Sequence, residues 1–224
     1  MPQASPAADI ARHVPSAVLL ETRVIAVLRA AHARDYAPVI EALLAGGVRS
    51  IELTLSTPGV LEQLPQLTRR FGDAAEVGVG TVTDVGQVDR LVDAGASYIV
   101  TPHTDPAIIQ AGISRGVPVY PGGLTPTELL AGWRAGATAV KVFPASTVGP
   151  GYLAQLRGPF PDMAYIPSGG IGIDDAAAWI RAGALAVSLG GPLIGDAFKG
   201  GDLQDLRRRA ATVRTNVDEA RNSL

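Results

Sequence analysis

Short runs rich in β-branched residues alternate with longer stretches rich in alanine and leucine, at intervals of about 20 residues between residues 24 and 191. The short runs are typical of buried strands, and the longer stretches carry apolar residues at the spacing of an amphipathic helix. The pattern predicts eight strands, at residues 24–28, 50–55, 76–80, 97–101, 117–122, 138–143, 164–169 and 186–191. Repeated strand–helix units of this kind form parallel sheets.

Glycines mark the ends of several expected helices. A residue in the left-handed conformation, usually glycine, often follows the last turn of a helix. Glycine stands at this place in ALLAGGVRS, LVDAGAS, AGISRGVP, GWRAGAT and WIRAGALA. The segment LTPTE predicts a helix start, with Thr125 as the N-cap, Pro126 in the first turn and Glu128 three residues after the cap. Each helix is thus expected to lead into a strand within a few residues.

Eight such units in 224 residues favour a closed barrel. The alternative, an open doubly wound sheet, would place a glycine-rich loop after its first strand, whereas LRAAHARD follows here. We therefore predict an α/β protein with one domain, a (β/α)₈ TIM barrel with a C-terminal helix over residues 16–224. Residues 1–15 are expected to form a partly disordered N-terminal tail, because their first part is rich in proline, alanine and serine.

Composition excludes several classes of function. The formal net charge of −2 gives no basic surface for nucleic acid, and no apolar stretch is long enough to span a membrane. The chain has no cysteine, and its three histidines do not have the spacing of metal ligands. The first residues lack a basic segment followed by an apolar core. We expect a cytoplasmic protein that uses neither a metal nor another cofactor.

Alternation along the strands brings polar side chains into the barrel, because successive residues face opposite sides of a sheet. In SIELTLS the apolar residues should face the helices, which leaves Glu52, Thr54 and Ser56 facing the lumen. The same reasoning in TAVKVF sends Lys141 and Phe143 inward. Arg29, at the end of the first strand, is expected at the same mouth of the barrel.

Lys141 is one of only two lysines, since arginine supplies the other 17 of the 19 basic residues. An ammonium group is costly to bury, so a lysine inside a barrel tends to lose its proton and become a nucleophilic amine. Such an amine can form a Schiff base with a 2-keto acid. Glu52 would then serve as general base and general acid. The alternative is a structural ion pair between Lys141 and Glu52.

Two glycine-rich segments, IPSGGI at residues 166–171 and SLGG at residues 188–191, end the last two expected strands. In barrels, the loops after these strands commonly bind phosphate through backbone N–H groups. The candidate phosphate ligands are Ser168, Gly169, Gly170, Gly190 and Gly191. The alternative is that these segments are tight turns without a ligand. Thr81, Pro102 and Phe143 also follow strands and are expected to shape a pocket for the keto acid.

These motifs resemble a known family in their order and spacing. The segments GGVRSIELTLSTP, VGVGTVTD, IVTPH, PGGLTPTE, VKVFPAS, GPFPDMAYIPSGGI and LGG are similar to those of the 2-keto-3-deoxy-6-phosphogluconate (KDPG) and 4-hydroxy-2-oxoglutarate (KHG) aldolases. The resemblance implies that Lys141 forms the Schiff base and that Glu52 is the general acid and base. It places Thr81, Pro102 and Phe143 in the substrate pocket and the Ser168–Gly170 segment at the phosphate. It also implies a homotrimer.

The sequence departs from the family pattern at two positions. Many members have arginine where Ser56 stands, and that arginine helps to hold the substrate carboxylate, so Arg29 would have to take this role here. Members usually have serine where Gly191 stands, so one hydroxyl donor to the phosphate is missing.

The resemblance implies a class I aldolase, a carbon–carbon lyase that cleaves KDPG to pyruvate and glyceraldehyde 3-phosphate, KHG to pyruvate and glyoxylate, or both. One alternative is the same chemistry on 2-keto-3-deoxy-6-phosphogalactonate (KDPGal). An alternative of another class is a barrel that binds a phosphorylated metabolite without imine chemistry, because the fold alone does not determine function.

Overall fold

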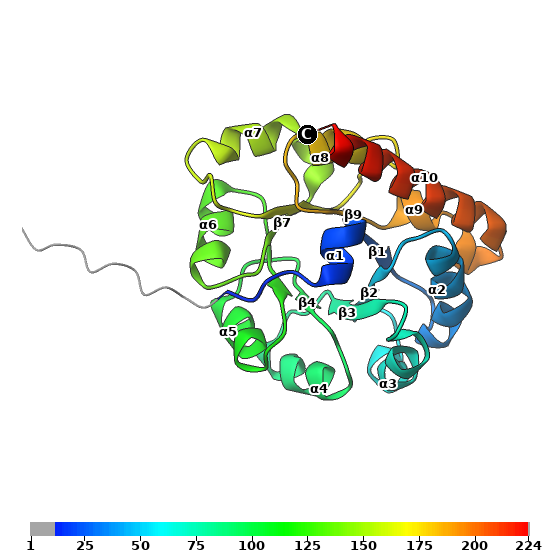
Figure 1. Ribbon diagram of the computed structural model, residues 1–224. Helices are drawn as coiled ribbons and strands as arrows, with labels where there is room; N and C mark the ends of the chain where they lie inside the picture. Colours follow the sequence, from blue (N-terminus) through cyan, green and yellow to red (C-terminus); the bar gives the residue numbers. More distant parts are fainter. Residues whose placement is uncertain (1–11, 224) are drawn as a thin grey trace, which may run out of the picture.

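Short parallel strands wound into a ring form the centre of the protein, and helices surround them (Figure 1). The structure is a computed structural model that describes residues 12–223. The strands are β1 (Val24–Leu28), β2 (Ser50–Thr54), β3 (Glu76–Gly80), β4 (Ile99–Val100), β5 (Val119–Tyr120), β6 (Gly122–Gly123), β7 (Val140–Val142), β8 (Tyr165–Pro167) and β9 (Val187–Leu189). The helices are α1 (Ala17–Thr22), α2 (Tyr36–Ala45), α3 (Val60–Phe71), α4 (Val88–Asp93), α5 (Pro106–Ser114), α6 (Pro126–Arg134), α7 (Gly151–Arg157), α8 (Ala176–Arg181), α9 (Gly191–Ile194) and α10 (Leu203–Asn222).

Backbone pairing closes the strands into a barrel. One sheet has the order β5-β4-β3-β2-β1-β9 and the other has the order β6-β7-β8, with every pair parallel. A parallel bridge between Ser168 and Ser188 joins the ends of β8 and β9. On the other side, the chain runs from β5 to β6 through Pro121, whose carbonyl accepts a 2.8 Å hydrogen bond from the Lys141 amide. The predicted (β/α)₈ barrel is confirmed, and the alternative prediction of a doubly wound sheet is wrong.

The expected fifth strand at residues 117–122 is two strands, β5 and β6. The break falls at Pro121, because proline has no amide hydrogen to donate to the ladder. The strand expected at residues 97–101 is likewise only the two residues of β4. Apolar composition marks residues that are buried, whereas the bounds of a strand depend on which backbone groups pair with a neighbouring strand.

Side chains of the strands divide into two apolar clusters, as alternation predicts. The outer cluster includes Ile51 and Leu53 of β2 and lies between the strands and the helices. The inner cluster fills the lumen and includes Tyr98 and Tyr120, whose ring centroids are 5.5 Å apart. Ala139, which shares the parity of Lys141, belongs to the inner cluster. The inward orientation expected from the sequence is therefore confirmed on both sides of the barrel.

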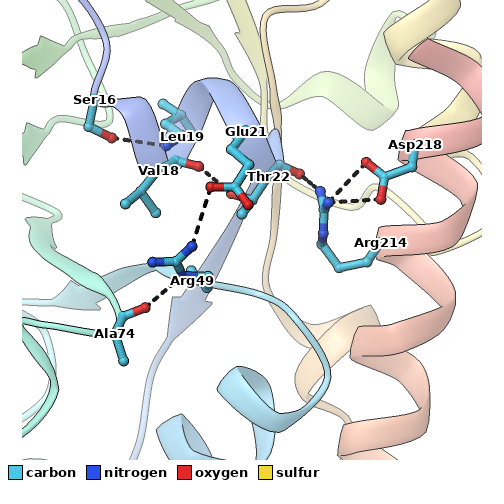
Figure 2. A network of polar contacts seen from close by, with 9 residues as sticks. All are labelled: Ser16, Val18, Leu19, Glu21, Thr22, Arg49, Ala74, Arg214 and Asp218. Atoms are coloured by element: carbon cyan, nitrogen blue, oxygen red, sulfur yellow. Dashed lines mark hydrogen bonds and ion pairs between the residues drawn. The ribbon is translucent and has the colours of Figure 1, made fainter. Parts of the chain in front are cut away.

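Helix α1 covers the amino-terminal end of the barrel, where it lies in the middle of the ring of helices (Figure 1). Its residue Leu19 is fully buried and completes the inner cluster. A network of polar contacts holds α1 in place (Figure 2). Arg49 bonds to Glu21 at 3.3 Å and to the Ala74 carbonyl at 2.8 Å, and Arg214 of α10 donates to the Thr22 carbonyl. One end of the lumen is thus closed.

Helix boundaries follow the signals in the sequence. Thr125 and Glu128 form the expected capping box at the start of α6, and Pro126 is its first residue. The five predicted helix ends contain glycines with positive φ, which are Gly47, Gly95, Gly116, Gly136 and Gly183. The expected C-terminal helix is α10, which packs against α2 and α8. No helix among residues 12–223 is both long and apolar enough to cross a membrane.

Most of the expected N-terminal tail, residues 1–11, lies outside the described residues. The part that is described contacts the barrel: the Arg12 guanidinium lies over the ring of Trp133, 3.4 Å from its centroid. His13 Nε2 is 3.2 Å from the Ile113 carbonyl oxygen.

Two glycines of β3 make room for large side chains in the lumen. A Cβ atom on Gly78 would lie 2.3 Å from the Tyr98 ring, which is fully buried and cannot move without disturbing the inner cluster. A Cβ atom on Gly80 would likewise collide with the Glu52 side chain.

We predict that Gly78→Ala lowers the free energy of unfolding by about 1–3 kcal/mol, because the added methyl overpacks the lumen against Tyr98. Urea denaturation monitored by circular dichroism measures the change. Gly151→Ala is the matched control, since no atom lies within 4 Å of its Cβ position in the first turn of α7. The control should be neutral or slightly stabilising. Equal stability of the two variants would contradict the packing described for β3.

Candidate active site

A cavity of about 440 Å³ opens at the carboxyl ends of the strands, at the end of the barrel that α1 does not cover. It brings together every site residue predicted from the sequence: Arg29, Glu52, Thr81, Pro102, Lys141, Phe143, Ser168, Gly169, Gly170, Gly190 and Gly191. Because these residues come from strands or strand ends all round the barrel, only the closed sheet can place them in one cavity.

Lys141 is the middle residue of β7 and points into the lumen between the outward-facing Val140 and Val142. The residue is 7% exposed. Its Nζ atom lies 5.1 Å from the centroid of the Phe143 ring, which also lines the cavity. An amine held in this way is shielded from bulk water but open to a molecule that enters the cavity.

Glu52, in the middle of β2, is 1% exposed and lines the same cavity. Its carboxylate lies over Gly80 of β3, where a Cβ atom would come within 1.9 Å of Glu52 Oε1. Its Oε2 atom is buried without a hydrogen-bond partner. The ion pairs among residues 12–223 do not include one between Glu52 and Lys141. The geometry therefore leaves the carboxylate free to exchange a proton with a ligand, and it does not support the structural ion pair.

Burial controls the protonation of Glu52. Loss of hydration raises the pKa of this carboxyl group, and the nearby charges of Lys141 and Arg29 oppose the rise. A carboxyl group with a raised pKa is a stronger base than an exposed one and, once protonated, still a usable acid.

The two glycine-rich segments lie together at one side of the cavity. Ser168 follows β8, and its hydroxyl donates a 3.2 Å hydrogen bond to Ser188 Oγ. Gly169 and Gly170 have φ of 91° and 73°, a region that residues with a side chain rarely adopt. The space beside Gly191 is open, because no atom lies within 4 Å of its Cβ position. Both segments line the cavity, and their glycines add no side chain of their own to it.

Thr81 and Pro102 form part of the wall contributed by the loops after β3 and β4. Thr81 is a non-glycine residue with a φ of 62°. This conformation is costly for a β-branched residue and is typical of positions where a site dictates the backbone.

The mouth of the cavity carries an exposed cation at Arg29, directly after β1. Ser56, the other position considered for the carboxylate, lies past the end of β2 and is exposed. Its hydroxyl donates to Thr54 Oγ1 at 3.2 Å, and the residue does not line the described cavity. Within residues 12–223, no cluster of three His, Cys, Asp or Glu side chains could hold a metal.

Sequence reasoning did not include some cavity residues among the site candidates: Val27, Thr54, Ile194, Gly195, Phe198 and Lys199. Strand parity carried a signal for Val27 and Thr54, which face inward with Arg29 and Glu52. Phe198 and Lys199 had no such signal, because they belong to a short 3₁₀ helix (Ala197–Lys199) after the last strand.

The sequence matches a family model over most of its length. The model described as "KDPG and KHG aldolase" matches residues 16–208. The chain belongs to this family. It is similar to 2-dehydro-3-deoxy-6-phosphogalactonate aldolase of Escherichia coli (strain K12), with 35% identity over 75% of this chain and 83% of that relative.

Solved structures give the same result for the fold. A KDPG aldolase from Legionella pneumophila, with pyruvate captured as a covalent carbinolamine intermediate, is 30% identical with a TM-score of 0.78 and covers 88% of this chain and 96% of that chain. A cube-shaped protein cage designed by fusing symmetric oligomeric domains is 31% identical with a TM-score of 0.84 and covers 91% of this chain and 74% of that chain. The family recognised in the sequence is confirmed.

The buried carboxyl group leads to a prediction about stability. Because the pKa of Glu52 is raised in the folded state, the folded protein holds this proton more tightly than the unfolded chain does. The resulting stabilisation is complete below the ordinary carboxyl pKa of about 4.3 and is lost as the pH rises through the raised value. The free energy of unfolding of the wild type should therefore fall with rising pH relative to that of Glu52→Gln. Urea titrations of both proteins at several pH values measure this, and a constant difference would contradict it.

Proposed function

We propose that the protein is a class I aldolase in which Lys141 forms a Schiff base with a 2-keto acid and Glu52 transfers protons. The observation that carries the proposal is the pairing of one buried amine with one buried carboxyl group that has a free oxygen, in a single cavity. A phosphometabolite-binding barrel would need neither group inside its lumen, where each is costly to bury.

The first step is attack of the neutral Lys141 amine on the C2 ketone of the substrate, which gives a carbinolamine. Glu52, in its protonated form, donates a proton to the departing hydroxyl group, so that water leaves and a protonated imine remains. The positive imine nitrogen then accepts electrons from the bond that breaks. The Legionella pneumophila relative captured at the carbinolamine stage supports this order of events.

In the second step, Glu52 as the carboxylate removes the proton of the C4 hydroxyl group. The electron pair of the C3–C4 bond moves toward the imine, the aldehyde product forms, and an enamine stays on Lys141. Protonation of the enamine at C3 and hydrolysis of the imine release pyruvate and regenerate the amine. The role of Glu52 in these proton transfers is supported by its position, because Glu52 and Lys141 line the same cavity.

Binding groups surround this pair. Arg29 is proposed to hold the substrate carboxylate at the mouth, since Ser56 does not line the cavity. The backbone of Ser168, Gly169, Gly170, Gly190 and Gly191 is proposed to bind a phosphate. Thr81, Pro102 and Phe143 are proposed to shape the space around the keto acid.

The proposed substrates are KDPG, which gives pyruvate and glyceraldehyde 3-phosphate, and KHG, which gives pyruvate and glyoxylate. The galactonate epimer KDPGal is a second candidate, favoured by the 35% identity to the Escherichia coli relative that is described as an aldolase for it. The reaction needs neither a metal nor another cofactor in this scheme. Location in the cytoplasm stays a prediction from the sequence.

We predict that borohydride reduction in the presence of pyruvate adds a stable adduct to the protein, because reduction traps the imine. Peptide mass spectrometry should localise the adduct to Lys141. Lys141→Met should abolish it and lower kcat/KM about 10³-fold or more. Lys199→Met removes the only other lysine of the chain and is the matched control, which should still form the adduct with pyruvate. An adduct on Lys199 alone, or none, would overturn the mechanism, and loss of cleavage with a chelator would favour a metal-dependent aldolase.

Comparison of substrates separates the remaining candidates. We expect cleavage of KDPG, KDPGal or both with a lower KM than that of KHG, because the glycine-rich segments give a phosphate backbone donors that KHG does not use. Coupled assays for pyruvate measure kcat/KM for the three compounds. Equal KM values for phosphorylated and unphosphorylated substrates would argue against a phosphate site at these segments.

A homotrimer is the proposed assembly. The resemblance to the family implies it, and the similar protein cage assembled from symmetric oligomeric domains supports a symmetric oligomer. Light scattering on the purified protein should give three times the mass of the chain. A mass equal to that of one chain would contradict the proposal.

A further inference from the structure

We propose that Lys199 binds the phosphate of the substrate and so sets the preference for phosphorylated over unphosphorylated keto acids. The inference rests on the proposed aldolase function and adds a residue to its specificity. Lys199 is the only lysine of the chain besides Lys141, and it lines the same cavity from the segment that follows β9.

Lys199 follows the second glycine-rich segment closely in the chain, and both line one cavity. After Gly190 and Gly191 the chain forms the single turn α9, passes Gly195 and enters the 3₁₀ helix that ends at Lys199. Cavity-lining residues occur throughout this stretch. Lys199 is exposed, whereas Lys141 is buried. The two amines therefore occupy different depths of one cavity, and only the deeper one is shielded for imine chemistry.

The backbone at Lys199 is fixed by its surroundings. The Phe198 ring packs edge-on against the buried Tyr36, with 5.8 Å between ring centroids. The Lys199 amide donates a 2.7 Å hydrogen bond to the Asp196 carbonyl. In the part of the segment before Lys199, the Leu193 and Ile194 carbonyls accept hydrogen bonds of 2.7 and 2.9 Å from Arg209 of α10. These contacts hold the base of the lysine side chain, so its ammonium group can reach only a limited part of the cavity.

The charged groups of the cavity and of the substrate indicate a role for this ammonium group. The ionisable side chains that line the described cavity are Arg29, Glu52, Lys141 and Lys199. In the proposed reaction, Lys141 forms the imine and Arg29 holds the carboxylate. A phosphate ester carries a further charge of about −2 at neutral pH. Lys199 is the cation that remains to balance it.

Two of the candidate phosphate ligands offer no free side-chain hydroxyl that would do the same work. Gly191 has none, and the space at its Cβ position is open. The Ser168 hydroxyl is buried and donates to Ser188 Oγ. A lysine that lines the same cavity as the glycine-rich segments supplies a mobile donor and a charge where the backbone supplies fixed N–H groups.

The test compares Lys199→Ala with the wild type on KDPG, KDPGal and KHG. We expect the KM for the phosphorylated substrates to rise about tenfold, with little change in kcat, because only binding of the phosphate is lost. The KM for KHG should stay the same. Inorganic phosphate, used as a competitive inhibitor, should bind the variant about tenfold more weakly. Added salt should raise the KM for the phosphorylated substrates more in the wild type than in the variant, because salt screens an exposed charge.

Controls separate this inference from the proposed function. Arg181→Ala removes a cation from the exposed surface of α8, outside the cavity, and should not change any of these constants. Lys199→Arg should keep most of the preference for phosphate. An unchanged KM in Lys199→Ala, or equal changes for KHG and the phosphorylated substrates, would overturn the inference while leaving the aldolase function intact. Cleavage of KHG alone by the wild type would also overturn it. No cleavage and no pyruvate adduct in the wild type would instead refute the function.

Discussion

Burial of one carboxyl group and one amine inside an apolar barrel is the constraint on which the rest of the structure depends. Each charged group costs several kcal/mol to remove from water, and neither has a close ion-pair partner in the other. The barrel supplies the compensating stability through its two apolar clusters. The cost falls on two residues that border the cavity, where strain and unsatisfied groups are tolerated when they serve function.

Closure of the sheet brings these two buried groups to one cavity. Glu52 lies in the six-stranded sheet and Lys141 in the three-stranded one, so their meeting depends on the bridge between Ser168 and Ser188 and on the continuous chain at Pro121. Glycine at position 80 leaves the space that the Glu52 side chain occupies. The chemistry thus depends on residues that carry no functional group of their own.

The sequence predicted the parts of the structure that follow from periodicity. Alternation in β2 and β7 oriented Glu52 and Lys141 correctly, and the motifs around them identified the family. The break at Pro121 was missed, because a run of apolar residues does not reveal which backbone groups are paired. Lys199 was missed for a different reason: its segment has no strand or helix period, and tertiary contacts such as the packing of Phe198 on Tyr36 hold it at the cavity.

Helix α1 closes the amino-terminal end of the lumen with the fully buried Leu19, so the cavity has its opening at the other end. In the proposed reaction, the pyruvate unit is bound covalently to Lys141 at depth, and the aldehyde lies between it and the mouth. Departure of the aldehyde then opens the side of the imine that faces the mouth, from which water can reach it. A cavity that opens at the mouth of the barrel thus favours an ordered release: the fragment formed nearest the solvent departs first, and the keto acid, which stays bound to Lys141 until hydrolysis, leaves last.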